Sequence, residues 1–168
     1  MTIDQDLEKI ALQEKCLQFT RFDAETAWAI GTALKASAER RKAFVTIDIQ
    51  LHGTQLFGYA MPGTTPDNWE WVRRKRNVVL RYHRSSYAVG LEHQRAKTTL
   101  EGSTGLALKD YSTHGGCFPI MLAGTGCVGT ITVSGLPQRD DHEMVVQVLQ
   151  DILQINGQDL ALAAQPES

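Results

Sequence analysis

"CFPIMLAGTGCVGTITVSG", residues 117–135, is the stretch of sequence that decides the fold. It contains two apolar runs of strand length, 117–124 and 127–135, on either side of Thr125-Gly126. Two such runs around a short glycine-containing turn are typical of a β-hairpin. The stretch therefore predicts two antiparallel strands late in the chain.

A second hairpin and several helices surround this one. Residues 43–51 and 56–61 flank the turn sequence "HGTQ" and predict the second hairpin. Other segments carry apolar residues at helical spacing. We predict helices over 2–18, 23–42, 66–89 and 137–157, with a shorter helical piece within 90–105. Hairpins interrupted by helices favour the α+β class, whereas a parallel nucleotide-binding sheet would need regular crossovers and a phosphate-loop motif that the sequence lacks.

The composition excludes several classes of protein. The 168 residues carry a formal net charge of −2, so no strongly basic field favours nucleic acid as a partner. No apolar run approaches the roughly 20 residues of a membrane span. The N-terminus "MTIDQDLEKI" does not follow the order of a secretory signal. We expect a cytoplasmic protein that binds neither membranes nor nucleic acid.

Three longer motifs carry a resemblance to a known family. They are "WEWVRRKRNVVLRYHRSSY" (69–87), "YSTHGGCFPI" (111–120) and "GTGCVGTITVSGLPQRDDHEMVV" (124–146). Together they resemble the haem-degrading-domain family, also called GlcG/HbpS-like, and in particular its uncharacterised branch. The resemblance covers about residues 20–155.

The resemblance implies a profilin-like fold, in which helices pack on both faces of a five-stranded antiparallel sheet. Four strands are evident in the sequence, and we assign the fifth to "GLALK" at 105–109. We expect one domain over 1–168, with a core at about 20–157, the N-terminal helix 2–18 and a flexible C-terminal tail. The family commonly forms homo-oligomers. Haem enters as a cofactor through the resemblance alone, and no residue here matches an iron ligand.

The predicted helix 66–89 is strongly basic. Because each helical residue turns by about 100°, its successive cations cannot share one face. One interpretation is a solvated face with salt bridges. The other is that one or two cations, Lys75 and Arg74 among them, bind an anion such as a carboxylate or phosphate in a pocket. The basic residues are Arg73, Arg74, Lys75, Arg76, Arg81, His83 and Arg84.

The motif His114-Gly115-Gly116-Cys117 has two interpretations. It is either a turn that leads into a strand, or a ligand site. Glycines can adopt positive φ, and their amides can form a concave anion site. His114 could act as an acid, a base or a ligand. Cys117 is expected to be a core thiol, and Tyr87 a residue at the rim of the pocket.

The sequence does not favour a metal site. His83, His93, His114 and His142 include no closely spaced pair on a helix. Acidic residues beside His142 are expected to cap the last helix. The three cysteines form no CxxC pair, so reduced thiols are expected.

Three functions stay open at this stage. The first is a small-molecule binding protein for an anionic or haem-type ligand, with His114, Gly115, Gly116, Lys75, Arg74 and Tyr87 as candidate ligand-binding residues. The second is a non-enzymatic homo-oligomeric scaffold that binds other proteins. The third is a metal or redox enzyme that uses His114 and Cys117. The sequence assigns no catalytic residue.

Overall fold

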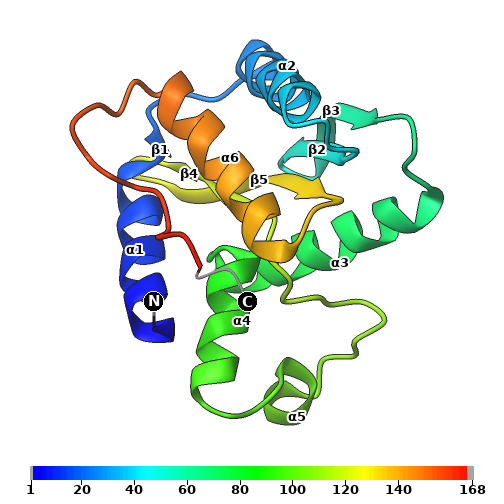
Figure 1. The fold of residues 1–168 in the computed structure, drawn as a ribbon, viewed down its shortest axis with the longest axis vertical. Helices are drawn as coiled ribbons and strands as arrows, with labels where there is room; N and C mark the ends of the chain where they lie inside the picture. Colours follow the sequence, from blue (N-terminus) through cyan, green and yellow to red (C-terminus); the bar gives the residue numbers. More distant parts are fainter. Residues whose placement is uncertain (1, 166–168) are drawn as a thin grey trace.

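The computed structural model describes residues 2–165, which form six helices and five strands (Figure 1). In chain order these are α1 (Ile3–Cys16), β1 (Gln18–Phe19), α2 (Ala24–Arg40), β2 (Thr46–Leu51), β3 (Thr54–Ala60), α3 (Pro66–Tyr82), α4 (Ser86–Arg95), α5 (Leu100–Thr104), β4 (Cys117–Leu122), β5 (Gly126–Ser134) and α6 (Gln138–Ile152). The end of the predicted tail, 166–168, lies outside the described residues. In the part of the chain that is described, no helix has both the length and the apolar character needed to cross a membrane.

The strands form one sheet in the order β1-β4-β5-β2-β3. Both predicted hairpins are present, because β2 pairs antiparallel with β3 and β4 pairs antiparallel with β5. β5 also pairs antiparallel with β2 and so joins the two hairpins at the centre of the sheet. The predicted α+β class and the five-stranded sheet are confirmed.

The identity and direction of the fifth strand were predicted wrongly. Residues 105–109 form no strand, because Gly105 ends α5 in the left-handed region at φ 75° and a loop follows. The fifth strand is β1, which pairs in parallel with β4 through Gln18 and Met121. The sheet is therefore mixed and not fully antiparallel. A two-residue strand has no alternating pattern, so the periodicity of the sequence could not reveal it.

The two faces of the sheet differ in their chemistry. α2 and α6 cover one face and α3 covers the other (Figure 1). The face under α2 and α6 contributes apolar side chains to the main core, namely Ile47, Ile49, Phe118, Ile120, Ile131 and Val133. Because strand side chains alternate between faces, the face under α3 receives the intervening polar residues, namely Thr46, Asp48, Thr130, Thr132 and Ser134. On that face Arg76 of α3 pairs with the buried Asp48 at 2.9 Å.

The predicted long helix 66–89 is two helices. α3 ends at Tyr82, and His83 caps it in the left-handed region at φ 54°. Ser85 is the N-cap of α4, since its hydroxyl accepts a hydrogen bond from the N–H of Ala88 at 3.2 Å. Ser86 and Tyr87 therefore begin α4 and do not end a longer helix.

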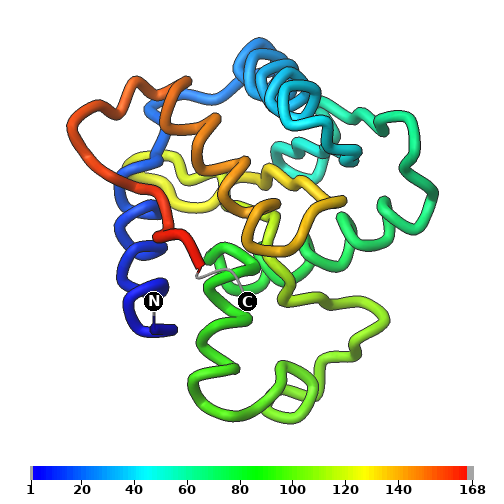
Figure 2. The backbone as a smooth tube through the Cα atoms, in the orientation of Figure 1, coloured from blue at the N-terminus to red at the C-terminus, as the bar shows by residue number. Residues whose placement is uncertain are grey.

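The C-terminal segment packs against the first helix. α6 ends at Ile152 and not at the predicted Gly157. The segment that follows runs back alongside α1 (Figure 2). The side-chain amide of Gln13 donates to the carbonyl of Leu160 at 2.7 Å, and both Leu160 and Leu162 are buried. The segment therefore contributes to the packing as far as Leu162.

A buried histidine connects these terminal elements. His142 on α6 lies between the rings of Tyr87 and Phe118, and its Nε2 is 2.7 Å from Oε1 of Gln13. Burial lowers the pKa of His142 to about 3. The same imidazole in the unfolded chain binds a proton near pH 6.5. The unfolded state therefore binds more protons between these values, so His142 lowers stability as the pH falls through 6.5.

We predict that His142→Gln reduces the acid sensitivity of the fold. Between pH 7 and pH 5 the wild-type protein should lose about 2 kcal/mol more of its free energy of unfolding than the variant does. Urea denaturation of both proteins at the two pH values measures this difference. Equal losses in the two proteins would contradict the assignment.

Candidate functional site

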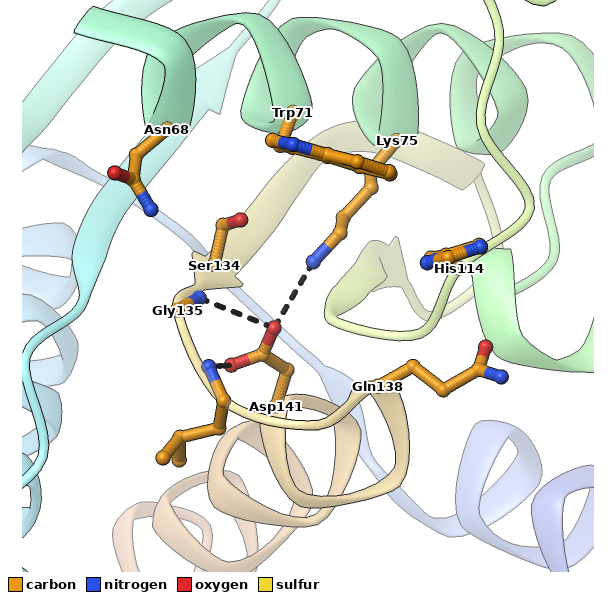
Figure 3. Close-up of a pocket in the computed structure, with 9 residues that line it drawn as sticks. Asn68, Trp71, Lys75, His114, Ser134, Gly135, Gln138 and Asp141 are labelled. Atoms are coloured by element: carbon orange, nitrogen blue, oxygen red, sulfur yellow. Dashed lines mark hydrogen bonds and ion pairs between the residues drawn. The ribbon is translucent and has the colours of Figure 1, made fainter. Parts of the chain in front are cut away.

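A cavity of about 230 Å³, which we call the lysine pocket, opens at the end of the polar layer (Figure 3). Three segments far apart in the sequence build it: the first half of α3, the loop before β4, and the turn from β5 into α6. Its lining residues are Asn68, Trp71, Lys75, His114, Ser134, Gly135, Leu136, Gln138 and Asp141.

Lys75 lies buried at one wall of this pocket. Its Nζ donates to Oδ2 of Asp141 at 3.0 Å and to the carbonyl of Val133 at 3.3 Å (Figure 3). An ammonium group carries three protons. Among residues 2–165 the third proton has no acceptor, which leaves one donor of a buried cation beside the cavity.

Asp141 is held by donors on all sides. Besides Lys75, the backbone N–H of Leu136 donates to Oδ1 at 2.9 Å and that of Gly135 donates to Oδ2 at 3.3 Å. Burial raises the pKa of Asp141, while Lys75 and these two N–H groups act in the opposite direction. The sequence suggested a helix cap here. Asp141 instead fixes the turn before α6, whose N-cap position is Pro137.

Two glycines allow the loop before β4 to approach this turn. A Cβ atom at Gly115 would lie 2.3 Å from the carbonyl oxygen of Gln138. A Cβ atom at Gly116 would lie 2.3 Å from that of Val133 and 2.9 Å from Nζ of Lys75, and Gly116 has φ 130°. The N–H of Gly115 also donates to Oε1 of Gln138 at 3.2 Å. Only residues without a side chain fit at both positions.

His114 stands at the mouth of the pocket. Its exposed ring stacks on Trp71 with 5.0 Å between ring centroids and 34° between planes. Partial burial lowers its pKa below 6.5, and the charges of Lys75 and Arg74 lower it further. The imidazole is therefore neutral at pH 7 and offers one donor and one acceptor.

The structure brings together four of the six residues singled out in the sequence. Lys75 and His114 line the pocket, and Gly115 and Gly116 form the loop behind it. Arg74 faces a neighbouring cavity. Tyr87 lines neither cavity, because it is buried in α4, where its hydroxyl lies 3.3 Å from Arg139.

Sequence reasoning missed the polar residues that complete the pocket. Asn68 and Trp71 come from α3, and Ser134 comes from the polar face of β5. The alternation of "TITVS" at 130–134 carried the signal for Ser134, since both faces of that strand are covered. Two other basic residues of α3 form salt bridges, Arg73 with Asp110 and Arg76 with Asp48.

The cysteines and histidines offer little to a redox or metal enzyme. Cys117 is buried, its sulfur accepts a hydrogen bond from Thr132 at 3.1 Å, and burial raises its pKa to about 12. A thiol in this state is a poor nucleophile. Across residues 2–165, no three His, Cys, Asp or Glu side chains gather closely enough to hold a metal ion.

The fold defines a class of protein shared with several solved structures. The crystal structure of HbpS superposes with a TM-score of 0.61 at 22% identity, covering 81% of this chain and 92% of that one. The structure of a PduOC:haem complex superposes with a TM-score of 0.65 at 16% identity, covering 76% and 92%. The crystal structure of the Ybr137w protein gives a TM-score of 0.82 at 29% identity, covering 89% and 88%.

The chain belongs to the HbpS-like haem degrading protein family, whose model matches residues 22–150. The resemblance drawn from the three sequence motifs is thereby confirmed. A UPF0303 protein of Azotobacter vinelandii is 57% identical over 162 residues, which cover 96% of this chain and 98% of the relative. A UPF0303 protein of Serratia proteamaculans is 55% identical over 153 residues, which cover 91% and 95%.

We predict that Lys75→Met lowers the free energy of unfolding by about 3–5 kcal/mol, because it leaves Asp141 buried without its counter-charge. The double variant Lys75→Met/Asp141→Asn should recover most of this loss. Lys35→Met, which removes an exposed pair with Glu39, is the control and should cost less than about 1 kcal/mol. Urea denaturation measures all three, and a Lys75→Met protein as stable as the control would refute the prediction.

We also predict that Gly116→Ala destabilises the protein by at least about 3 kcal/mol, because the methyl group meets the Val133 carbonyl and φ is positive. Gly124→Ala is the matched control. Gly124 also has positive φ but open space around it, so only the backbone strain of about 1–2 kcal/mol applies. Thermal unfolding of the two variants compares them. Equal losses would mean that the close approach at Gly116 carries no energy.

Proposed function

We propose that this protein binds a small anionic molecule, such as a carboxylate, in the lysine pocket. The observation that carries the proposal is the buried ammonium of Lys75 with one proton unused beside a cavity. A donor buried without an acceptor is costly, and a ligand oxygen would satisfy it. The carboxylate of Asp141 does not oppose this, because its own donors already surround it.

Other groups at the pocket suit the same ligand. The Oδ1 atom of Asn68 accepts the N–H of Thr65 at 3.0 Å, so its amide nitrogen is left as a donor and points toward Ser134 in Figure 3. The Ser134 hydroxyl and the neutral imidazole of His114 add further donors. Thr46, the cross-strand partner of Ser134, has a buried hydroxyl with no hydrogen bond to residues 2–165. A lining rich in donors complements the oxygens of an acid group.

Haem is one molecule that carries such acid groups. The family description and the PduOC:haem complex support a haem-type ligand as one candidate. The pocket, at about 230 Å³, is smaller than typical small-molecule sites of about 300–1,000 Å³ and does not enclose a whole macrocycle. It fits an acid group of such a ligand. If a haem-type ligand binds, His114 at the mouth of the pocket is the residue that would hold its iron, because imidazole is a common iron ligand.

A homo-oligomeric scaffold is the second candidate function. Two exposed aromatic side chains that line one surface, Trp28 on α2 and Tyr59 on β3, support it. A cavity of about 570 Å³ lies there beside β3, at the edge of the described sheet. Aromatic side chains are enriched in protein interfaces.

We also propose a cytoplasmic location, supported by three cysteines that are all free thiols.

We predict that a pocket ligand raises the melting temperature by about 5–10 °C at 100 times its dissociation constant. The probes are acetate, benzoate, phosphate and haemin, each followed by thermal unfolding. Asn68→Ala and Ser134→Ala should each weaken binding of the active probe about tenfold, the effect of losing one hydrogen bond to a charged group. These variants keep the Lys75–Asp141 pair and so keep the fold.

Asn156→Ala, at an exposed position outside the pocket, is the control and should bind like the wild-type protein. No shift with any of the four probes would refute the binding function. A shift that survives unchanged in both pocket variants would place the ligand elsewhere.

A further inference from the structure

A second cavity, of about 310 Å³, lies directly beside the lysine pocket. The two cavities share a common wall, formed by Trp71 and His114. The second cavity extends from this wall between α3, the end of α4 and the loop before β4. Its lining includes Leu100, Leu108 and Tyr111, so it is less polar than the lysine pocket.

Each cavity contains one cation of α3. Lys75 belongs to the lysine pocket and Arg74 to the second cavity. The guanidinium of Arg74 lies 4.6 Å from the centre of the Trp71 ring, and its Nε donates to the carbonyl of Leu108 at 2.8 Å. Neither of its terminal nitrogens has an acceptor among the described residues 2–165. Arg74 therefore keeps donors for an acid group, as Lys75 does.

The wall between the two cavities is the stack of His114 on Trp71, and few hydrogen bonds hold His114 in place. The backbone N–H of His114 donates to the hydroxyl of Ser112 at 3.2 Å. Its ring nitrogens form no hydrogen bond with residues 2–165, and the ring stacks on Trp71. A single stack of this kind is a weak contact. Rotation of one exposed side chain would join the two cavities, and a ligand ring could take the place of the imidazole on the indole.

We propose that the two cavities are the halves of one site for a planar aromatic molecule with two acid groups. One acid group binds Lys75, Asn68 and Ser134, the second binds Arg74, and the ring between them lies on Trp71. This inference rests on the proposed function and narrows its ligand to a two-headed aromatic acid. Leu100, Leu108 and Tyr111 of the second cavity pack against the edge of the ligand ring, because their apolar surfaces offer few hydrogen bonds to a polar ligand.

Paired mono-acid and di-acid probes test this arrangement. Benzoate carries one acid group, while terephthalate and naphthalene-2,6-dicarboxylate carry two at increasing separations. Isothermal titration calorimetry of the wild-type protein should give at least tenfold tighter binding for one of the di-acids than for benzoate. Quenching of tryptophan fluorescence should accompany binding, because the ring covers Trp71.

Arg74→Gln separates the two halves. In the variant the di-acid should lose its advantage over benzoate, so that the two probes bind within about twofold of each other. Arg81→Gln removes the same charge from an exposed position of the same helix and should keep that advantage. The comparison cancels the general effect of net charge on anion binding.

The outcomes distinguish this inference from the function on which it rests. If benzoate and both di-acids fail to bind, the aromatic ligand is refuted, and the binding function itself is refuted only when acetate, phosphate and haemin fail as well. If benzoate binds and neither di-acid binds more tightly, the anion site stands and the two-headed ligand is refuted. If the di-acid advantage survives in Arg74→Gln, or disappears equally in Arg81→Gln, the role of Arg74 is refuted.

Discussion

The contact between Lys75 and Asp141 joins the parts of the molecule that form the site. Lys75 comes from α3 on one face of the sheet, and Asp141 comes from the first turn of α6, which covers the other face. The two side chains meet at 3.0 Å beside the end of β5. There Lys75 also donates to the Val133 carbonyl, and the N–H groups of Gly135 and Leu136 donate to Asp141. A buried pair of this kind need not add stability over an apolar pair, but neither partner tolerates loss of the other.

The polar layer under α3 gives this pair its surroundings. In an ordinary two-sided sheet both faces would be apolar. Here Thr46, Asp48 and Ser134 occupy buried positions on the face that Arg76 and Lys75 cover. Buried polar groups need hydrogen-bond partners. The layer ends in a cavity where some hydrogen-bond donors have no acceptor among the described residues. A binding site at this end is consistent with the chemistry of the whole face.

Sequence reasoning succeeded where the information is local. The hairpin at 117–135 follows from two strand-length runs and a glycine turn, and the helix predicted over 23–42 follows from apolar residues at helical spacing. It failed where a distant partner decides the structure. The strand Gln18–Phe19 exists because β4 has a free edge beside it, and residues 66–89 divide because Ser85 caps a new helix and its N–H binds Glu14.

By itself the sequence determined the class of fold and the family, because periodicity, turn residues and motifs are local features of the chain. It also nominated residues for an anion site from their side-chain chemistry. Only the tertiary structure decided which of those residues meet. Lys75 and Asp141 lie 66 positions apart in the sequence and yet are in contact. Arg74, the residue directly before Lys75, faces a different cavity. The helix rotates each residue by about 100°, so the direction of a side chain depends on which face of α3 packs on the sheet.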